Sequence, residues 1–132
     1  MRLASIAILA TFVLATPAWA DAASDLAAAK ATIAAANLSE ESDLDMWCGA
    51  AFTLAAVSLD AAGNATDAAL AKKAADALFG KAAPLLTGDG VAEADLGNIS
   101  TQYMVVANAQ MIEKSEEAEH TQEECQTAAT AL

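Results

Sequence analysis

The stretch Leu44–Asp60, LDMWCGAAFTLAAVSLD, is an almost uninterrupted apolar run, and it decides the fold. From Met46 to Leu59 it covers fourteen residues. As an α-helix this run would rise about 21 Å, which is short of the ~30 Å that a bilayer core requires. Aspartates flank it on both sides, so we expect no membrane span. A helix that is apolar all round in a small domain lies between other helices, so the stretch predicts the central wall of a helical core.

The first twenty residues have the features of a secretory signal peptide. Arg2 precedes an apolar run, and Ala18-Trp19-Ala20 closes the segment with a small-x-small cleavage pattern. We therefore expect residues 1–20 to be removed, the protein to be exported to the periplasm, and residues 21–132 to form one helical domain of 132 − 20 = 112 residues. The alternative is an uncleaved N-terminal anchor, which needs a longer apolar run.

The predicted mature chain is strongly acidic. Without Arg2 it holds five lysines against eighteen carboxylates, so its formal net charge is 5 − 18 = −13. Such a surface repels nucleic acid and anionic lipid, and we expect neither as a partner. It favours a soluble protein that meets a basic protein, a cation, or nothing in particular.

Composition and apolar spacing predict an all-α chain. Alanine, the best helix former, dominates, while β-branched runs and hairpin dipeptides are nearly absent. Regularly spaced large apolar residues argue against low-complexity disorder. Ser39 as an N-cap, Gly63 as a helix end and the TGDG turn divide the chain, and Pro84 predicts a kink or a break. The expected helices cover about residues 22–36, 40–60, 65–86, 91–114 and 119–129.

These segments predict a single small bundle of four to five helices stapled by one disulfide. The first helix has little to bury and is expected to be the weakest element. The fourth has two apolar faces: Val105 and Ile112 point away from a larger set, which is Leu96, Ile99, Tyr103, Val106, Ala107 and Met111. An internal neighbour is the commoner explanation for a second face, and a partner surface or a homodimer is the alternative.

The two cysteines, Cys48 and Cys125, predict one structural disulfide, because an even count in an exported chain indicates pairing. Closing a loop of 125 − 48 = 77 residues would stabilise the fold by roughly 4 kcal/mol. The spacing matches neither a redox Cys-x-x-Cys motif nor a haem attachment motif. Free thiols, an intermolecular bridge and metal binding are the alternatives.

The polar stretch Glu113–Cys125 holds the single histidine of the chain. On a helix Glu116, His120 and Glu124 would share one stripe, which is a candidate weak site for Zn²⁺, Cu²⁺ or Ni²⁺. A solvated acidic face is the favoured interpretation, because three ligands at most are present. His120 also has a second candidate use as a pH sensor, since its acidic neighbours would raise its pKa.

Catalytic motifs are absent from the sequence, so we expect a non-enzymatic protein without a cofactor. The leading hypothesis is a small exported acidic protein that acts by contact with an unidentified protein partner. A second hypothesis is an acid or envelope-stress chaperone. The chain resembles HdeA-type chaperones in size, export and cysteine number, and that resemblance implies loosening as carboxylates neutralise below about pH 3. Weak divalent-metal binding is the third hypothesis.

Overall fold

The structure, a computed structural model, describes residues 18–131. In this range the chain has no strand, which confirms the predicted all-α bundle. Most of the predicted signal peptide lies outside the described residues, and the predicted cleavage site after Ala20 falls in the first turn of α1. The elements are α1 (Ala18–Ala36), α2 (Glu40–Ala61), α3 (Ala65–Gly88), the 3₁₀ turn η1 (Glu93–Asp95), α4 (Leu96–Asn108), the π-helix η2 (Ala109–Glu113) and α5 (Gln122–Thr130).

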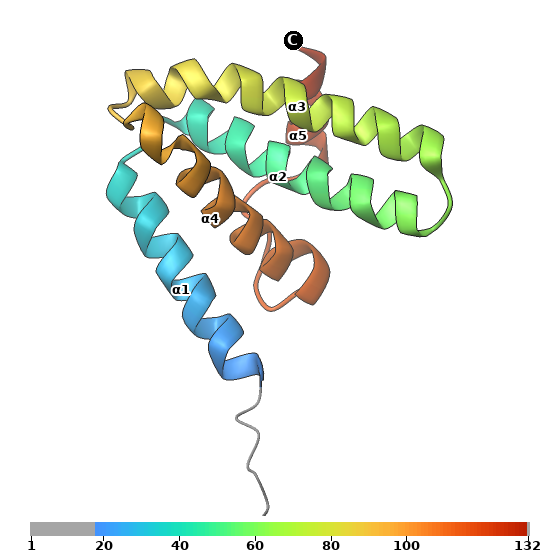
Figure 1. The fold of residues 1–132 in the computed structure, drawn as a ribbon, viewed down its shortest axis with the longest axis horizontal. Helices are drawn as coiled ribbons and strands as arrows, with labels where there is room; N and C mark the ends of the chain where they lie inside the picture. The colour runs from blue at the N-terminus through green and yellow to red at the C-terminus, as the bar shows by residue number, and fades with distance from the viewer. Residues whose placement is uncertain (1–17, 132) are drawn as a thin grey trace, which may run out of the picture.

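Helices α2 and α3 form a long hairpin that is the backbone of the bundle (Figure 1). They approach closely at Gly49, where an added β-carbon would lie 2.8 Å from Cε1 of Phe79. Glycine at this position therefore lets the Phe79 ring lie directly against the backbone of α2. The first half of the opening stretch, Met46–Ala51, is buried in the core as predicted, whereas residues 52–60 are partly or fully exposed.

The helix ends follow the predicted capping signals. The Ser39 side chain accepts a hydrogen bond from the Ser42 amide, and Asn64 caps α3 by accepting from the Asp67 amide. Gly63, between these helices, has a φ of +80°, the left-handed conformation that glycine adopts without strain. The predicted turn after α2 is therefore confirmed.

Helix α3 continues through Pro84 to Gly88, so the predicted break at Pro84 is absent. Proline removes one amide and leaves the carbonyl of Gly80 without its usual partner. Both Gly80 and Pro84 are exposed, so water can satisfy that carbonyl at little cost. Helix α3 tolerates Pro84 because this part of the helix faces solvent.

The predicted fourth helix is a composite of η1, α4 and η2, and it ends at Lys114 in the left-handed conformation, with a φ of +52°. Helix α1 packs alongside α4 (Figure 1) and fully buries Ala29. Val105 of α4 is partly buried and, with Leu26 of α1, lines the hollow between the two helices. An internal neighbour thus covers the second face of α4, while Ile112 stays 53 % exposed. The first helix docks on the bundle despite its small apolar face.

The core lies between α2, α3 and α4 and combines alanines with larger apolar side chains from each of these helices. Its largest fully buried members are Tyr103, Met46, Leu78, Leu86, Val106, Asp45, Cys48 and Ser42. Among the described helices, α2 alone is long and apolar enough to pass for a membrane span by length and composition. A core helix passes the same test, and the first half of α2 lies in the core, with 39 % of the apolar window of α2 buried.

Candidate functional site

The disulfide between Cys48 and Cys125 is present and joins α2 to α5. Both residues are buried, and their α-carbons are 5.2 Å apart. Helix α5 has only nine residues, and a capping box at Thr121 and Glu124 starts it. So short a helix is marginal by itself, so the covalent bond fixes its position against the hairpin.

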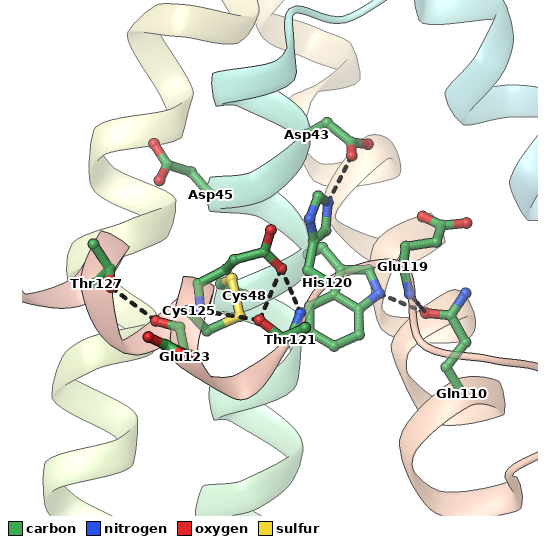
Figure 2. The surroundings of a disulfide bond; sticks show 12 residues. Asp43, Asp45, Cys48, Gln110, Glu119, His120, Thr121, Glu123, Cys125 and Thr127 are labelled. Carbon is green, nitrogen blue, oxygen red and sulfur yellow. Dashed lines mark hydrogen bonds and ion pairs between the residues drawn. A yellow bond between two sulfur atoms is a disulfide. The ribbon is translucent and has the colours of Figure 1, made fainter.

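Polar contacts gather beside this disulfide, on the connecting segment 114–121 between η2 and α5. Figure 2 shows His120 pointing from this segment toward Asp43 of α2. The His120 Nε2 atom lies 2.9 Å from Oδ2 of Asp43, and the Tyr103 hydroxyl donates a short hydrogen bond to Oδ1. Asp43 thus links three parts of the chain: α2, α4 and the connecting segment.

The ionisation of this cluster is set by its burial and its hydrogen bonds. Burial alone would raise the pKa of Asp43, but the hydrogen bonds from His120 and Tyr103 outweigh it and hold the pKa below its ordinary value. The hydrogen bond to Asp43 raises the pKa of His120, against the opposing effect of burial. Burial, and then the hydrogen bond to Asp43, strongly raise the pKa of Tyr103. The pairing therefore favours a charged His120 and a charged Asp43.

Gln110 of η2 forms a second polar junction with the connecting segment. Its Oε1 atom accepts from Trp47 Nε1 at 2.7 Å and from the Glu119 amide at 3.2 Å. Its Nε2 atom donates to Glu116 at 2.9 Å, and Glu116 in turn pairs with Lys30 of α1 at 2.8 Å. The Trp47 ring also meets the His120 ring edge-on, with centroids 5.7 Å apart. The two junctions hold the segment against α1, α2 and α4.

A groove of about 410 Å³ lies next to these junctions, between α2, η2, the connecting segment and α5. Its lining is mostly apolar and holds no carboxylate. The lining residues are Trp47, Ala51, Phe52, Ala55, Met111, Ala118, His120, Gln122, Cys125 and Gln126. Its volume falls within the ~300–1,000 Å³ range of ligand sites. Larger hollows of about 750 Å³ and 590 Å³ lie elsewhere and are lined in part by charged side chains, so this groove is the candidate binding feature without carboxylates.

A third polar cluster joins α2 to α3. Lys81 Nζ lies 3.0 Å from Oδ2 of the fully buried Asp45 and 3.0 Å from Glu41. The Oδ2 contact is an ion pair without hydrogen-bond geometry, and Oδ1 accepts a long hydrogen bond at 3.4 Å. Lys81 therefore compensates a charge that α2 buries in the core, which is a structural role.

No helix covers residues 114–121, so Glu116, His120 and Glu124, the candidate metal ligands, do not lie on one helical stripe. Glu116 pairs with Lys30, His120 pairs with Asp43, and Glu124 closes the capping box with Thr121. In residues 18–131 no group of three or more side chains gathers in a way that could hold a metal ion. Each of these three side chains instead makes a contact that holds the C-terminal region in place.

The acid–base groups that contact each other in this cluster are Asp43 and His120. In enzymes such a pair can orient an imidazole as a general base, which acts on a protein nucleophile, a water or a substrate group. Among the described side chains, Asp43 is the hydrogen-bond partner of His120, and no hydroxyl or thiol bonds to its ring. Both cysteines are consumed by the disulfide. The arrangement is therefore suited to holding the connecting segment in place.

Sequence reasoning missed Asp43, Tyr103, Gln110 and Asp89 as members of polar junctions. In the sequence, Asp43 is explained by its favourable position near the N-terminus of a helix and Tyr103 by a place in the core. Neither residue therefore indicates a contact with His120. Asp89 accepts hydrogen bonds from Ser39 and from the buried Ser42, and so ties the end of α3 to the start of α2. The contacts of Asp89 with Ser42, of Gln110 with Trp47 and of Asp43 with His120 join residues 47 to 77 positions apart, and sequence spacing does not reveal contacts of that kind.

Comparisons of the chain with models of known families, with curated proteins and with solved structures give no match. The interpretation of the site therefore rests on its own geometry.

Proposed function

We propose that this protein is exported to the periplasm and acts without catalysis, by contact with another protein. The observation that carries the proposal is the charge of its surface. Three of its five lysines, Lys30, Lys72 and Lys81, form ion pairs within the chain. Within the part of the chain that the structure describes, six carboxylates lie within ion-pair distance of a lysine or of His120, and the others have no such cation. A surface of this kind attracts basic proteins and raises their association rate.

Exposed apolar side chains support the same proposal. Val57 of α2 is 65 % exposed, Leu70 of α3 is 62 % exposed, and Ile112 of η2 is 53 % exposed. Single exposed apolar residues are common in soluble proteins, so the exposed residues support the proposal only together with the surface charge. Together with the apolar groove they offer contact area that a charged surface alone lacks.

The test is a pull-down from periplasmic extract with the purified disulfide-bonded protein as bait, followed by identification of the bound protein. We expect a stoichiometric basic partner at low salt and its progressive loss as salt rises, because screening weakens charge attraction. Light scattering on the bait alone gives its own oligomeric state. A bait that stays monomeric and retains no specific partner at low salt would contradict the proposal.

An acid-responsive chaperone is a second candidate, favoured by one structural observation. The junctions between helices run through carboxylates: Asp43 with His120, Glu116 with Lys30, and Asp89 with the serines at the start of α2. Protonation of these groups would weaken several junctions together, while the disulfide keeps α5 attached. Such loosening would uncover apolar surface that is hidden at neutral pH.

Near-UV circular dichroism at pH 7 and at about pH 2 tests this candidate, together with aggregation assays on an acid-denatured client protein. Loss of the near-UV signal with retained helicity and client protection would support it. An unchanged near-UV spectrum without client protection would contradict it.

A further inference from the structure

The connecting segment, residues 114–121, is attached to the bundle mainly by polar contacts. Ala118 is its single apolar residue, and only Glu116 and His120 are partly buried, whereas its other side chains are exposed. The segment begins at Lys114, a left-handed residue that is not glycine, with a φ of +52°. Because neither apolar burial nor helical hydrogen bonds hold these residues in place, their position depends on the polar contacts.

One set of these contacts depends on the carboxylate of Glu116. It accepts hydrogen bonds from Lys30 of α1 at 2.8 Å and from Gln110 of η2 at 2.9 Å. Glu119 lies 3.8 Å from the same lysine, and Glu113 lines the same hollow. The hydrogen bond from Lys30 lowers the pKa of Glu116, so this stabilising contact is present at neutral pH and is lost as the pH falls through the folded pKa.

The other set depends on the carboxylate of Asp43 in α2, which faces His120 of the segment at 2.9 Å and Tyr103 of α4. Burial raises the pKa of Asp43, but these hydrogen bonds outweigh it and lower the pKa, so this contact is also lost in acid. Glu119 and Glu124 favour the charge of His120 as well. Once these carboxylates are neutral, His120 is a partly buried cation without a charged partner, which costs free energy.

Trp47 of α2 is the apolar residue that the connecting segment shields. It is only 3 % exposed, and its ring meets the His120 ring edge-on with centroids 5.7 Å apart. Its Nε1 atom donates to Gln110, which also accepts from the Glu119 amide. Detachment of the segment would therefore expose the Trp47 ring and widen the apolar groove that Trp47, Ala118 and His120 line.

Both ends of the connecting segment are anchored. Its start follows η2, which continues α4, and its end leads into α5, where Cys125 is bonded to Cys48. Acid leaves this disulfide intact, because exchange requires a thiolate. We propose that the connecting segment is an acid-released strap, which leaves the bundle when Asp43 and Glu116 are protonated and so uncovers Trp47 while the disulfide keeps α5 attached. This inference deepens the acid-responsive candidate, on which it rests for the use of the uncovered surface.

Acrylamide quenching of Trp47 fluorescence measures the opening in the purified disulfide-bonded protein. Trp47 is the only tryptophan after the predicted leader. Between pH 7 and about pH 2 we expect the quenching constant to rise about 3-fold, with little loss of far-UV circular dichroism because the segment has no helix to lose. A Trp47 side chain that stays equally shielded over this range would contradict the inference.

Two pairs of substitutions separate release of the strap from a general loss of charge. Asp43→Asn with Glu116→Gln neutralises both contacts at pH 7, whereas Asp60→Asn with Glu117→Gln removes the same charge from exposed positions of the same two elements. We expect the first pair to show at pH 7 the quenching that the unmodified protein shows in acid, and the second pair to show none of this change. Equal quenching in the two pairs would refute the proposal.

Hydrogen exchange locates the part that opens and requires no variant. The Glu119 amide donates to Gln110 at 3.2 Å. After correction for the intrinsic effect of pH, we expect this amide to lose protection about 10-fold or more in acid, while the amides of α2 and α3 keep theirs. Simultaneous loss in the segment and in both helices would show that the whole bundle opens, and it would overturn the inference.

The fate of a client protein separates this inference from the acid-responsive candidate. If the segment opens as expected but an acid-denatured client still aggregates, the strap stands and the chaperone candidate fails. If the client is protected while Trp47 and the Glu119 amide stay shielded, the strap is refuted and the chaperone candidate stands.

Discussion

The hairpin of α2 and α3 and the C-terminal region of residues 109–131 are held in place by different means. The hairpin is held mainly by close packing, with Gly49 against Phe79 and with Leu78 and Leu86 fully buried or nearly so. The C-terminal region has short elements and few large apolar contacts with the rest, and it depends on the disulfide and on the junctions at Asp43 and Gln110.

We therefore expect the two regions to differ in how their stability depends on pH. Packing of apolar surface does not depend on ionisation, whereas the junction at Asp43 does. The groove lies where the two regions meet, with α2 on one side and the connecting segment and α5 on the other. Its shape therefore depends on how firmly the C-terminal region is attached, and the attachment can be weakened while the hairpin stays folded.

Removing the disulfide is the change with the largest expected effect. The double variant Cys48→Ala with Cys125→Ala frees a loop of 77 residues, and we expect the free energy of unfolding to fall by roughly 4 kcal/mol. Urea denaturation measures this loss. Hydrogen exchange should show that amides of α5 lose protection well before those of α2 and α3.

Reduction of the unmodified protein is the control for that variant. It should reproduce the same order of exposure without altering any residue. Equal loss of protection in the hairpin and in α5 would show that the two regions form one cooperative unit, and it would contradict the comparison.

Truncation of Leu78 tests the packed hairpin. Leu78 is fully buried on α3, so Leu78→Ala leaves a cavity and should cost about 3 kcal/mol. Leu70→Ala on the same helix is the matched control, because Leu70 is 62 % exposed, and its effect should stay within about 0.5 kcal/mol. Urea denaturation followed by circular dichroism measures both. Similar costs for the two variants would show that the hairpin is not the packed part of the fold.

Replacing the carboxylate of Asp43 tests the polar attachment. Asp43→Asn removes the charge that accepts hydrogen bonds from Tyr103 and His120, and we expect a loss of about 2 kcal/mol. Asp60→Asn, on the same helix and exposed, should change stability by less than about 0.5 kcal/mol. Trp47 fluorescence and near-UV circular dichroism should change in the first variant only. An unaltered Trp47 environment in Asp43→Asn would contradict a role for this junction in holding the segment.

The hairpin could be predicted from the sequence to a large extent, because its determinants are local. Apolar runs, the Ser39 cap and the Gly63 turn each indicate structure within a few residues. Of the kink or break predicted at Pro84, the break is absent, since whether proline breaks a helix depends on the exposure of the carbonyl it frees, and exposure is a property of the folded chain.

The candidate site could be predicted only in part. The disulfide follows from the cysteine count and the predicted export, and it is present. The pairing of His120 with Asp43 and the docking of Gln110 between Trp47 and Glu116 depend on where a segment without regular secondary structure crosses the bundle. The candidate stripe of Glu116, His120 and Glu124 requires a helix across this segment, and no helix covers residues 114–121.

The smallest expected effect is the pH dependence of the attachment through His120. The pKa of His120 is raised from 6.5, so its contribution is complete below about pH 6.5 and is lost as the pH rises through its folded pKa. The pKa of Asp43 is lowered from 3.8, so its contribution is present above about pH 3.8 and is lost as the pH falls through its folded pKa. The pair therefore stabilises the attachment most between these limits. We expect unmodified protein to lose stability relative to His120→Gln as the pH is raised from 6 to 9, measured by urea denaturation at each pH. The carboxylates are common to both proteins, so parallel curves would show that His120 contributes no ionised contact to the C-terminal region.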